Sequence, residues 1–175
     1  MGRAVDQKTN RRDQMDTEVE EQKKREEEAP WFDDGLRFKC TGCGHCCTGS
    51  PGYVYLSLDD LQRLSAHFGL TELEFAKKYT RQIEDQYALL DRSGSYDCIF
   101  LKDKQCSAYE ARPTQCRTFP WWIHNLRDPS DWEEAAQRCE GINHPDAPLV
   151  PSLHIQKECM TYLDNLLDQN FTLES

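Results

Sequence analysis

Cys40-Thr41-Gly42-Cys43-Gly44-His45-Cys46-Cys47 decides how this chain folds, because it places four thiols within eight residues. A thiolate is a soft, anionic ligand that selects zinc, copper(I) or iron–sulfur clusters. The C-x-x-C spacing lets two sulfurs reach one metal from a tight loop, and here the spacing repeats before a vicinal cysteine. The surrounding glycines permit the positive φ angles of such a loop. The stretch therefore predicts a metal site.

The vicinal pair Cys46-Cys47 predicts that the cysteines divide between two sites, or between a cluster and a supporting role. Adjacent side chains tend to point in different directions, so both fit poorly on one mononuclear tetrahedral centre. Remote cysteines must then complete the coordination, and eight thiolates suffice for two Cys₄ centres or two four-thiolate clusters. The predicted metal ligands are Cys40, Cys43, Cys46, Cys47, Cys98, Cys106, Cys116 and Cys139.

Two further residues receive other roles. Cys159 falls on the apolar stripe of the last predicted helix, where a free cysteine behaves as a small hydrophobe, so we expect it in the core. His45 can replace a thiolate as a ligand, but we expect a solvated neighbour or a group that supports a ligand by hydrogen bonding. No other histidine has ligand-like spacing.

The identity of the metal stays open between zinc and an iron–sulfur cluster. Cys40, Cys43 and Cys46 have the first spacings of the bacterial ferredoxin run, but the usual fourth spacing, x₃-Cys-Pro, is absent. A distant cysteine can supply the fourth ligand of a cubane. Zinc tolerates almost any loop pairing and makes fewer demands on the sequence.

Composition narrows the partners and the compartment. The 175 residues carry a formal net charge of −10, which argues against general affinity for nucleic acid or anionic membranes. No stretch reaches the roughly 20 apolar residues of a membrane helix, and the first 28 residues lack the apolar core of a secretory signal. We therefore expect a cytoplasmic protein, whose thiols stay reduced. Nine cysteines, an odd number, also leave one thiol over in any scheme of disulfides alone.

The chain is expected to divide into a charged, flexible or helical tail at residues 1–30 and a cysteine-cluster metal-binding domain at 31–175. The domain is predicted to be a small, loop-rich, metal-stabilised α+β fold with short strands and several helices. Ser57 and Thr71 begin capping boxes, and Gly69 is a natural helix end. The expected strands are 53–56, 87–90 and 96–101, with the last two joined by a turn, and further helices begin near Ser107 and Ser130 and span 152–169.

No sequence pattern assigns a reaction. We find no phosphate loop, dinucleotide fingerprint or nucleophile elbow, and no cysteine–histidine pair suited to nucleophilic catalysis. Whether the protein is an enzyme is left open. Trp121-Trp122 is more typical of packing than of base stacking in so acidic a chain.

Three segments resemble the CxxCxxCC cysteine-cluster family, the YkgJ-like proteins described as having a zinc- or iron-chelating domain. They are Phe38 to Cys47, Cys98-Ile99-Phe100-Leu101 with Cys106, and Tyr109 to Arg117 with its Arg112-Pro113 pair. The resemblance covers roughly residues 36–140 and implies that the eight cysteines above are the metal-associated positions. A similar cysteine domain occurs in flagellin lysine methylation, although this chain shows no evident region for a methyl donor.

The sequence thus predicts a cytoplasmic protein that holds zinc or an iron–sulfur cluster through cysteine thiolates. The alternatives are an iron–sulfur protein in electron transfer or protein modification, related to the lysine methylases, and a zinc-stabilised interaction module. In that module the tail or the Trp121-Trp122 region would dock an unknown protein partner. Metal ions are the expected ligands, with neither nucleic acid nor membrane.

Overall fold

The described residues form helices and short antiparallel strands in separate small sheets, which confirms the predicted α+β class. The computed structural model describes residues 29–48 and 52–173, so most of the predicted charged tail and residues 49–51 lie outside the described residues. The chain separates into two units, of which the second, Gly35–Ser175, holds all the elements named below. In the first unit, the Asp33 amide donates to the Pro30 carbonyl over 2.9 Å and closes a turn.

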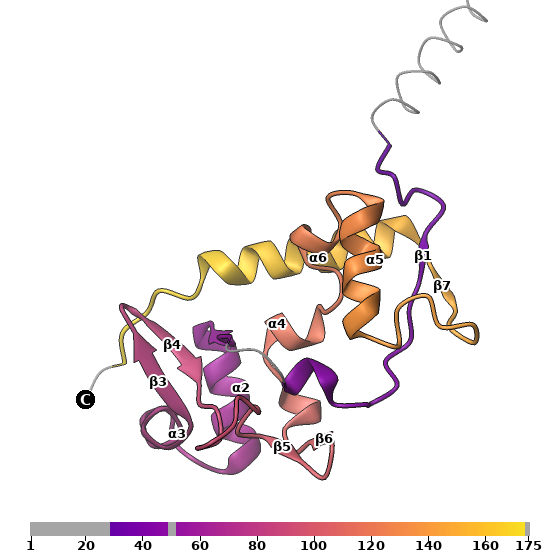
Figure 1. Cartoon of the computed structure of the whole chain (residues 1–175). Coiled ribbons are helices and arrows are strands. Elements are labelled where there is room, and N and C mark those ends of the chain that lie inside the picture. Colours follow the sequence, from indigo (N-terminus) through magenta and orange to yellow (C-terminus); the bar gives the residue numbers. More distant parts are fainter. Residues whose placement is uncertain (1–28, 49–51, 174–175) are drawn as a thin grey trace, which may run out of the picture. The chain divides into compact units, whose positions relative to one another are not determined.

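The described part of the second unit holds α-helices, 3₁₀ helices and three small sheets (Figure 1). The α-helices are α2 (Leu58–Phe68), α3 (Glu72–Tyr79), α4 (Thr114–Arg117), α5 (Pro129–Arg138) and α6 (Ser152–Leu167). The 3₁₀ helices are η1 (His45–Cys47), η2 (Tyr109–Ala111) and η3 (Ile123–Asn125). The sheets are β1–β7 (Leu36–Arg37 with Leu149–Val150), β2–β4–β3 (Tyr55–Leu56, Gln86–Leu89, Thr80–Ile83) and β5–β6 (Leu101–Lys102 with Gln105–Cys106).

The starts of α2 and α3 follow the predicted capping boxes. The Ser57 hydroxyl accepts from the Asp60 amide, the Thr71 hydroxyl accepts from the Glu74 amide, and each acidic side chain accepts in return from the cap's own amide. Gly69 ends α2 at φ +65°, the left-handed conformation that glycine adopts without strain. These helix ends are set by local hydrogen bonds, which is why the sequence shows them.

The expected strand 87–90 corresponds largely to Gln86–Leu89, whereas of the expected strand 96–101 only Leu101 lies in a strand. The two segments still meet, because the Ile99 amide donates to the Leu90 carbonyl over 3.0 Å. Gln86–Leu89 pairs with Thr80–Ile83, an earlier strand in the chain, and Cys98 forms an isolated antiparallel bridge with Asp91. The turn between the two strands places Glu84 at φ +53°. Helix α5 also starts earlier than expected, with Asp128 rather than Ser130 as its cap.

The core is richest where α2, α3 and β4 meet. Leu56, Leu61, Leu64 and Phe75 are fully buried there, and the Phe75 ring lies 6.1 Å from that of Phe100. Burying side chains of this size contributes roughly 1.5–3 kcal/mol each. This packing holds the segment that leads into Cys98 and Cys106.

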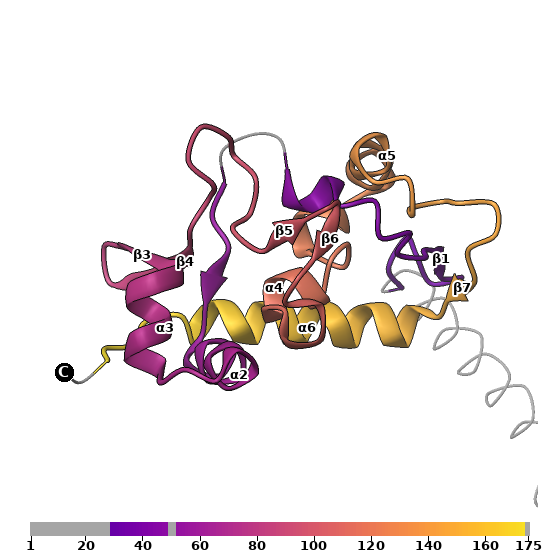
Figure 2. The same ribbon diagram turned by 90° about the horizontal axis from the view of Figure 1, so that it is seen from below.

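Helix α6 runs along the second unit from β7 toward the sheet that contains β4 (Figures 1 and 2). Its buried face includes Cys159, which confirms the predicted core role of that residue. Trp122 stacks on Tyr162 of this helix, with centroids 5.6 Å apart, while Trp121 is buried and stacks on Trp132 at 5.4 Å. Both tryptophans therefore pack within the domain, as predicted from the sequence in preference to base stacking.

Candidate metal centre

The cysteine run folds around Gly44, which begins η1. Gly44 has φ +77°, and a Cβ at this position would lie 2.7 Å from the Lys104 carbonyl oxygen. The Cys47 amide donates to the Gly44 carbonyl over 2.9 Å and closes the turn. Both views place η1 beside β5 and β6 (Figures 1 and 2). Glycine alone tolerates both the positive φ and the close contact with Lys104. The residue between Cys43 and His45 is therefore fixed by backbone geometry, in addition to the spacing that the cysteines need to reach a metal.

A second backbone pairing brings the Cys139 segment to the run. The Lys39 amide donates to the Gly141 carbonyl over 3.0 Å, and Phe38 bridges Ile142 in antiparallel fashion. A side chain at position 141 would collide with the Lys39 carbonyl. The close approach of these strands places Cys139, at the end of α5, and the following Glu140 opposite the start of the cysteine run.

Cys98 and Cys106 are held next to η1 by hydrogen bonds of the main chain. The Cys98 amide donates to the Cys47 carbonyl over 2.8 Å, a direct link between the run and the later segment. Cys106 lies on β6 opposite Leu101, in a hairpin whose turn places Asp103 and Lys104 at positive φ. This hairpin brings Cys106 back toward Cys98, whose pKa is raised by burial and also by the charge of Cys106.

Cys116 reaches the same place on α4, and a buried carboxylate fixes the start of that helix. Asp60, fully buried on α2, accepts from the Thr114 amide at 2.9 Å and from the Thr114 hydroxyl at 2.8 Å. The same carboxylate accepts from the Asn165 amide of α6 at 3.0 Å and pairs with Arg63. Asp60 thus links α2, α4 and α6 by hydrogen bonds and fixes the helix that carries Cys116.

Five thiols, called the thiol group here, interact electrostatically around this point. Burial raises the pKa of Cys116, and the charges of Cys98, Cys46 and Cys106 raise it further. The charges of Cys46, Cys98 and Cys116 add to the larger effects of hydrogen bonding and burial that raise the pKa of Cys47. Burial likewise raises the pKa of Cys98 and that of Cys106. The thiol group consists of Cys46, Cys47, Cys98, Cys106 and Cys116.

Cys46 differs from the rest of the group. Its Sγ lies 3.8 Å from the Sγ of Cys47, and the hydrogen bond from Cys47 lowers the pKa of Cys46 to about 7. The same bond, together with burial, raises the pKa of Cys47. Arg112, stacked on the Tyr109 ring at 3.8 Å, adds a smaller favourable charge effect on Cys46. Cys46 is therefore the thiol best prepared to ionise near neutral pH.

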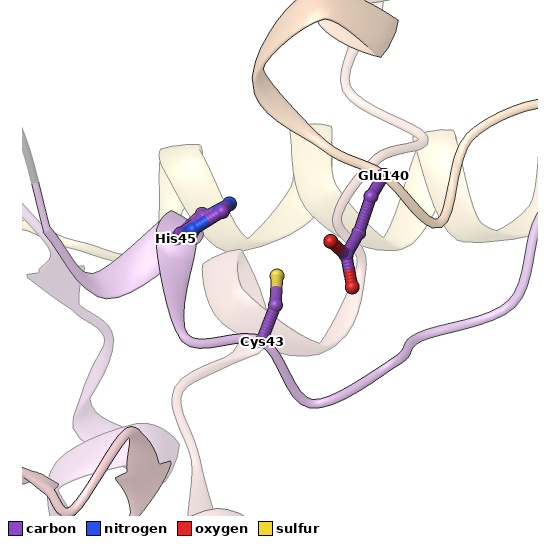
Figure 3. A group of neighbouring side chains, drawn as sticks. All are labelled: Cys43, His45 and Glu140. Carbon is purple, nitrogen blue, oxygen red and sulfur yellow. The ribbon is translucent and has the colours of Figure 1, made fainter.

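A second set of donors lies beside the thiol group. The Cys43 sulfur, a ring nitrogen of His45 and a carboxylate oxygen of Glu140 all lie within 4.8 Å of one another. Figure 3 shows Cys43 and His45 reaching from the run and Glu140 reaching across from the end of α5. Cys139 interacts electrostatically with Cys43 and Cys46, and burial raises its pKa.

The eight predicted ligands thus divide unevenly. Five form the thiol group, Cys43 belongs to the second set with Cys139 nearby, and Cys40 is exposed at the start of the run. Glu140 was not predicted from the sequence. Its position directly after Cys139 was the available signal, but its approach to Cys43 depends on the pairing of Lys39 with Gly141.

Comparison with known protein families gives one match, over residues 39–140, to the model described as "CxxCxxCC: Putative zinc- or iron-chelating domain". The chain belongs to this family. The match covers more than half of the sequence, confirms the resemblance drawn from the cysteines, and supports metal binding with zinc and iron both allowed. No solved structure matches the chain at a significant level. Within residues 29–48 and 52–173, no helix combines the length and apolarity needed to cross a bilayer.

Proposed function

We propose that the domain binds a metal centre through the thiol group and that this centre holds together the segments carrying Cys46, Cys98, Cys106 and Cys116. The supporting observation is that thiols from four separate segments interact with one another. Cys46 comes from η1, Cys98 from the segment before β5, Cys106 from β6 and Cys116 from α4. Family membership independently points to zinc or iron. All nine cysteines are free thiols, which suits a metal protein of a reducing compartment such as the cytoplasm.

Charge repulsion within the thiol group favours a bound cation. Gathering thiols in a half-buried place is unfavourable once they ionise, because each thiolate raises the pKa of its neighbours. A bound cation reverses this repulsion, and metal-bound thiols are deprotonated. Since the unfolded chain has no preformed site, the binding free energy of the metal adds to that of folding.

The test compares Cys46→Ser with Cys159→Ser in protein purified without oxygen. Cys46 is exposed, so its replacement leaves the core intact, while Cys159 is buried on α6 away from the thiol group. We expect Cys46→Ser to lose metal, measured by elemental analysis, and Cys159→Ser to keep the wild-type content. Wild-type metal content in Cys46→Ser and also in the double variant Cys46→Ser/Cys116→Ser, which leaves three of the five thiols, would refute the proposed centre.

The same preparation identifies the metal. A colourless protein with stoichiometric zinc indicates a structural centre, as in zinc-stabilised modules. Visible absorption together with an EPR signal after reduction indicates an iron–sulfur cluster, and with it electron transfer or protein modification. The clustering of five thiols, one more than a single tetrahedral zinc requires, makes the visible spectrum the informative measurement.

A further inference from the structure

We infer that Cys43, His45 and Glu140 form a separate binding site for a divalent zinc ion, with three protein ligands and one coordination position open to solvent. These residues share no member with the thiol group, so the inference goes beyond the proposed function. The donor atoms lie within 4.8 Å of one another. Two ligands of one tetrahedral zinc ion, at metal distances of about 2.0–2.3 Å, lie roughly 3.3–3.8 Å apart, so the donors must approach one another by about 1 Å. Small side-chain rotations therefore close the site.

The backbone behind the three donors is tied down on both sides. The Cys47 amide bonded to the Gly44 carbonyl fixes the turn that carries Cys43 and His45, and the Lys39–Gly141 hydrogen bond fixes the segment that carries Glu140. The donors thus come from two chain segments, about a hundred residues apart in sequence, that are paired by main-chain contacts. Adjustment is confined to side chains, which favours a defined metal position.

The chemistry of the donors selects zinc. Sulfur, imidazole nitrogen and carboxylate oxygen are the three ligand types that zinc accepts in proteins, whereas hard cations such as Mg²⁺ avoid thiolates. One thiolate and one carboxylate, together with a neutral imidazole, also balance the two positive charges of the ion. A neutral complex is well suited to a surface site in an acidic protein.

The solvent exposure of the three ligands determines how fast a bound zinc ion exchanges. His45 is exposed and so is Glu140, whereas Cys43 is half-buried, so solvent reaches the remaining tetrahedral position. Zinc sites with three protein ligands keep that position for water or an incoming ligand. Zinc held here should exchange readily, in contrast to a metal enclosed by the thiol group around Cys116. The further site is therefore a fast-exchanging zinc site next to a slowly exchanging centre.

The experiment titrates purified, metal-containing protein with Zn²⁺ and follows transfer of zinc to a colorimetric chelator over time. We expect wild-type protein to take up one additional equivalent that the chelator removes quickly. Glu140→Gln and His45→Gln should each weaken this equivalent by at least about tenfold, the smallest loss typical of changes around a metal ligand. Glu134→Gln, an exposed neighbour on α5, and His154→Gln, exposed on α6, are matched controls and should bind as wild type.

Wild-type zinc uptake by both Glu140→Gln and His45→Gln, with circular dichroism showing intact folding, would overturn the inference. Cys46→Ser separates it from the proposed centre, because that variant should lose the slowly exchanging metal and keep the fast equivalent. If Cys46→Ser keeps its metal while Glu140→Gln loses the fast zinc, only the proposed centre fails. A loss of both metals in Glu140→Gln would also contradict two separate sites.

Discussion

Replacing Asp60 by Asn should destabilise the domain and weaken its metal centre together. Asp60 is fully buried and its carboxylate accepts hydrogen bonds from Thr114 and Asn165 while pairing with Arg63. The carboxamide keeps the size of the side chain but removes the charge and turns one acceptor into a donor. That donor would then face either Asn165 or Thr114, which are themselves donors.

The magnitude follows from those contacts. Each buried donor left without a partner costs about 1–3 kcal/mol, and breaking a buried ion pair costs about 3–5 kcal/mol, an upper bound here because the Arg63 side chain is 32% exposed. The two effects overlap, so we expect a loss of about 4 kcal/mol in the free energy of unfolding. For a domain of this size that lowers Tm by roughly 8–16 °C. Because the carboxylate fixes the first residue of α4, Cys116 should also shift, and metal should be lost at lower chelator concentration.

The assay is thermal unfolding followed by circular dichroism, with metal content measured on the same samples. Asp59→Asn is the matched control, because Asp59 is the exposed neighbour in the first turn of α2. Removing that charge forfeits at most about 1 kcal/mol of helix-dipole interaction. If Asp60→Asn melts within 2 °C of Asp59→Asn, a margin near the smallest shift expected for 1 kcal/mol, the assigned role of the buried carboxylate is wrong.

Two further predictions follow from the same geometry. Gly44→Ala should lower the free energy of unfolding by about 1–2 kcal/mol because alanine is strained in the left-handed backbone conformation, and by more because its Cβ would clash with the Lys104 carbonyl. Gly94→Ala is the control, because Gly94 also has a positive φ but open space around it, so only the backbone strain should remain. Urea unfolding measures both variants. Metal-free protein should lose stability as the pH rises above about 8.5. Burial raises the pKa of Cys98, Cys106 and Cys116 in the folded state, so these thiols ionise first in the unfolded chain, which high pH then favours. Cys46, with its pKa of about 7, has the opposite effect, but only below that pH range. Urea unfolding of chelated protein at pH 7 and pH 10 checks this, and stability that is equal or greater at pH 10 would contradict it.

Some of this architecture is readable from the sequence, because it depends on neighbouring residues. The capping boxes at Ser57 and Thr71 and the stop at Gly69 are local hydrogen-bond patterns, and the structure has them where the sequence places them. The thiol spacing of the run likewise predicted a metal-binding family, which the family comparison confirms.

The features that were missed depend on a pairing partner outside the segment itself, which is the next strand in one case and a distant part of the chain in the other. Thr80-Arg81-Gln82-Ile83 is too polar to stand out as a strand, and it is defined by its partner Gln86–Leu89. Glu140 reaches Cys43 only because residues 38–39 pair with 141–142. No local pattern in either segment reports that contact, so a carboxylate beside the cysteine run could not be derived from spacing.

Two carboxylates lie near the thiol group, where they oppose ionisation of its thiols. Asp60 lies close enough to Cys116, and Asp91 close enough to Cys98, that each carboxylate adds to the forces disfavouring ionisation of its thiol. Arg112 acts in the favourable direction, on Cys46 and on Cys106. A site evolved to stabilise free thiolates, as in a nucleophilic cysteine enzyme, would surround them with positive charge. Carboxylates behind converging thiols instead suit a site whose compensating charge arrives with a bound cation, and this favours metal binding over thiol catalysis.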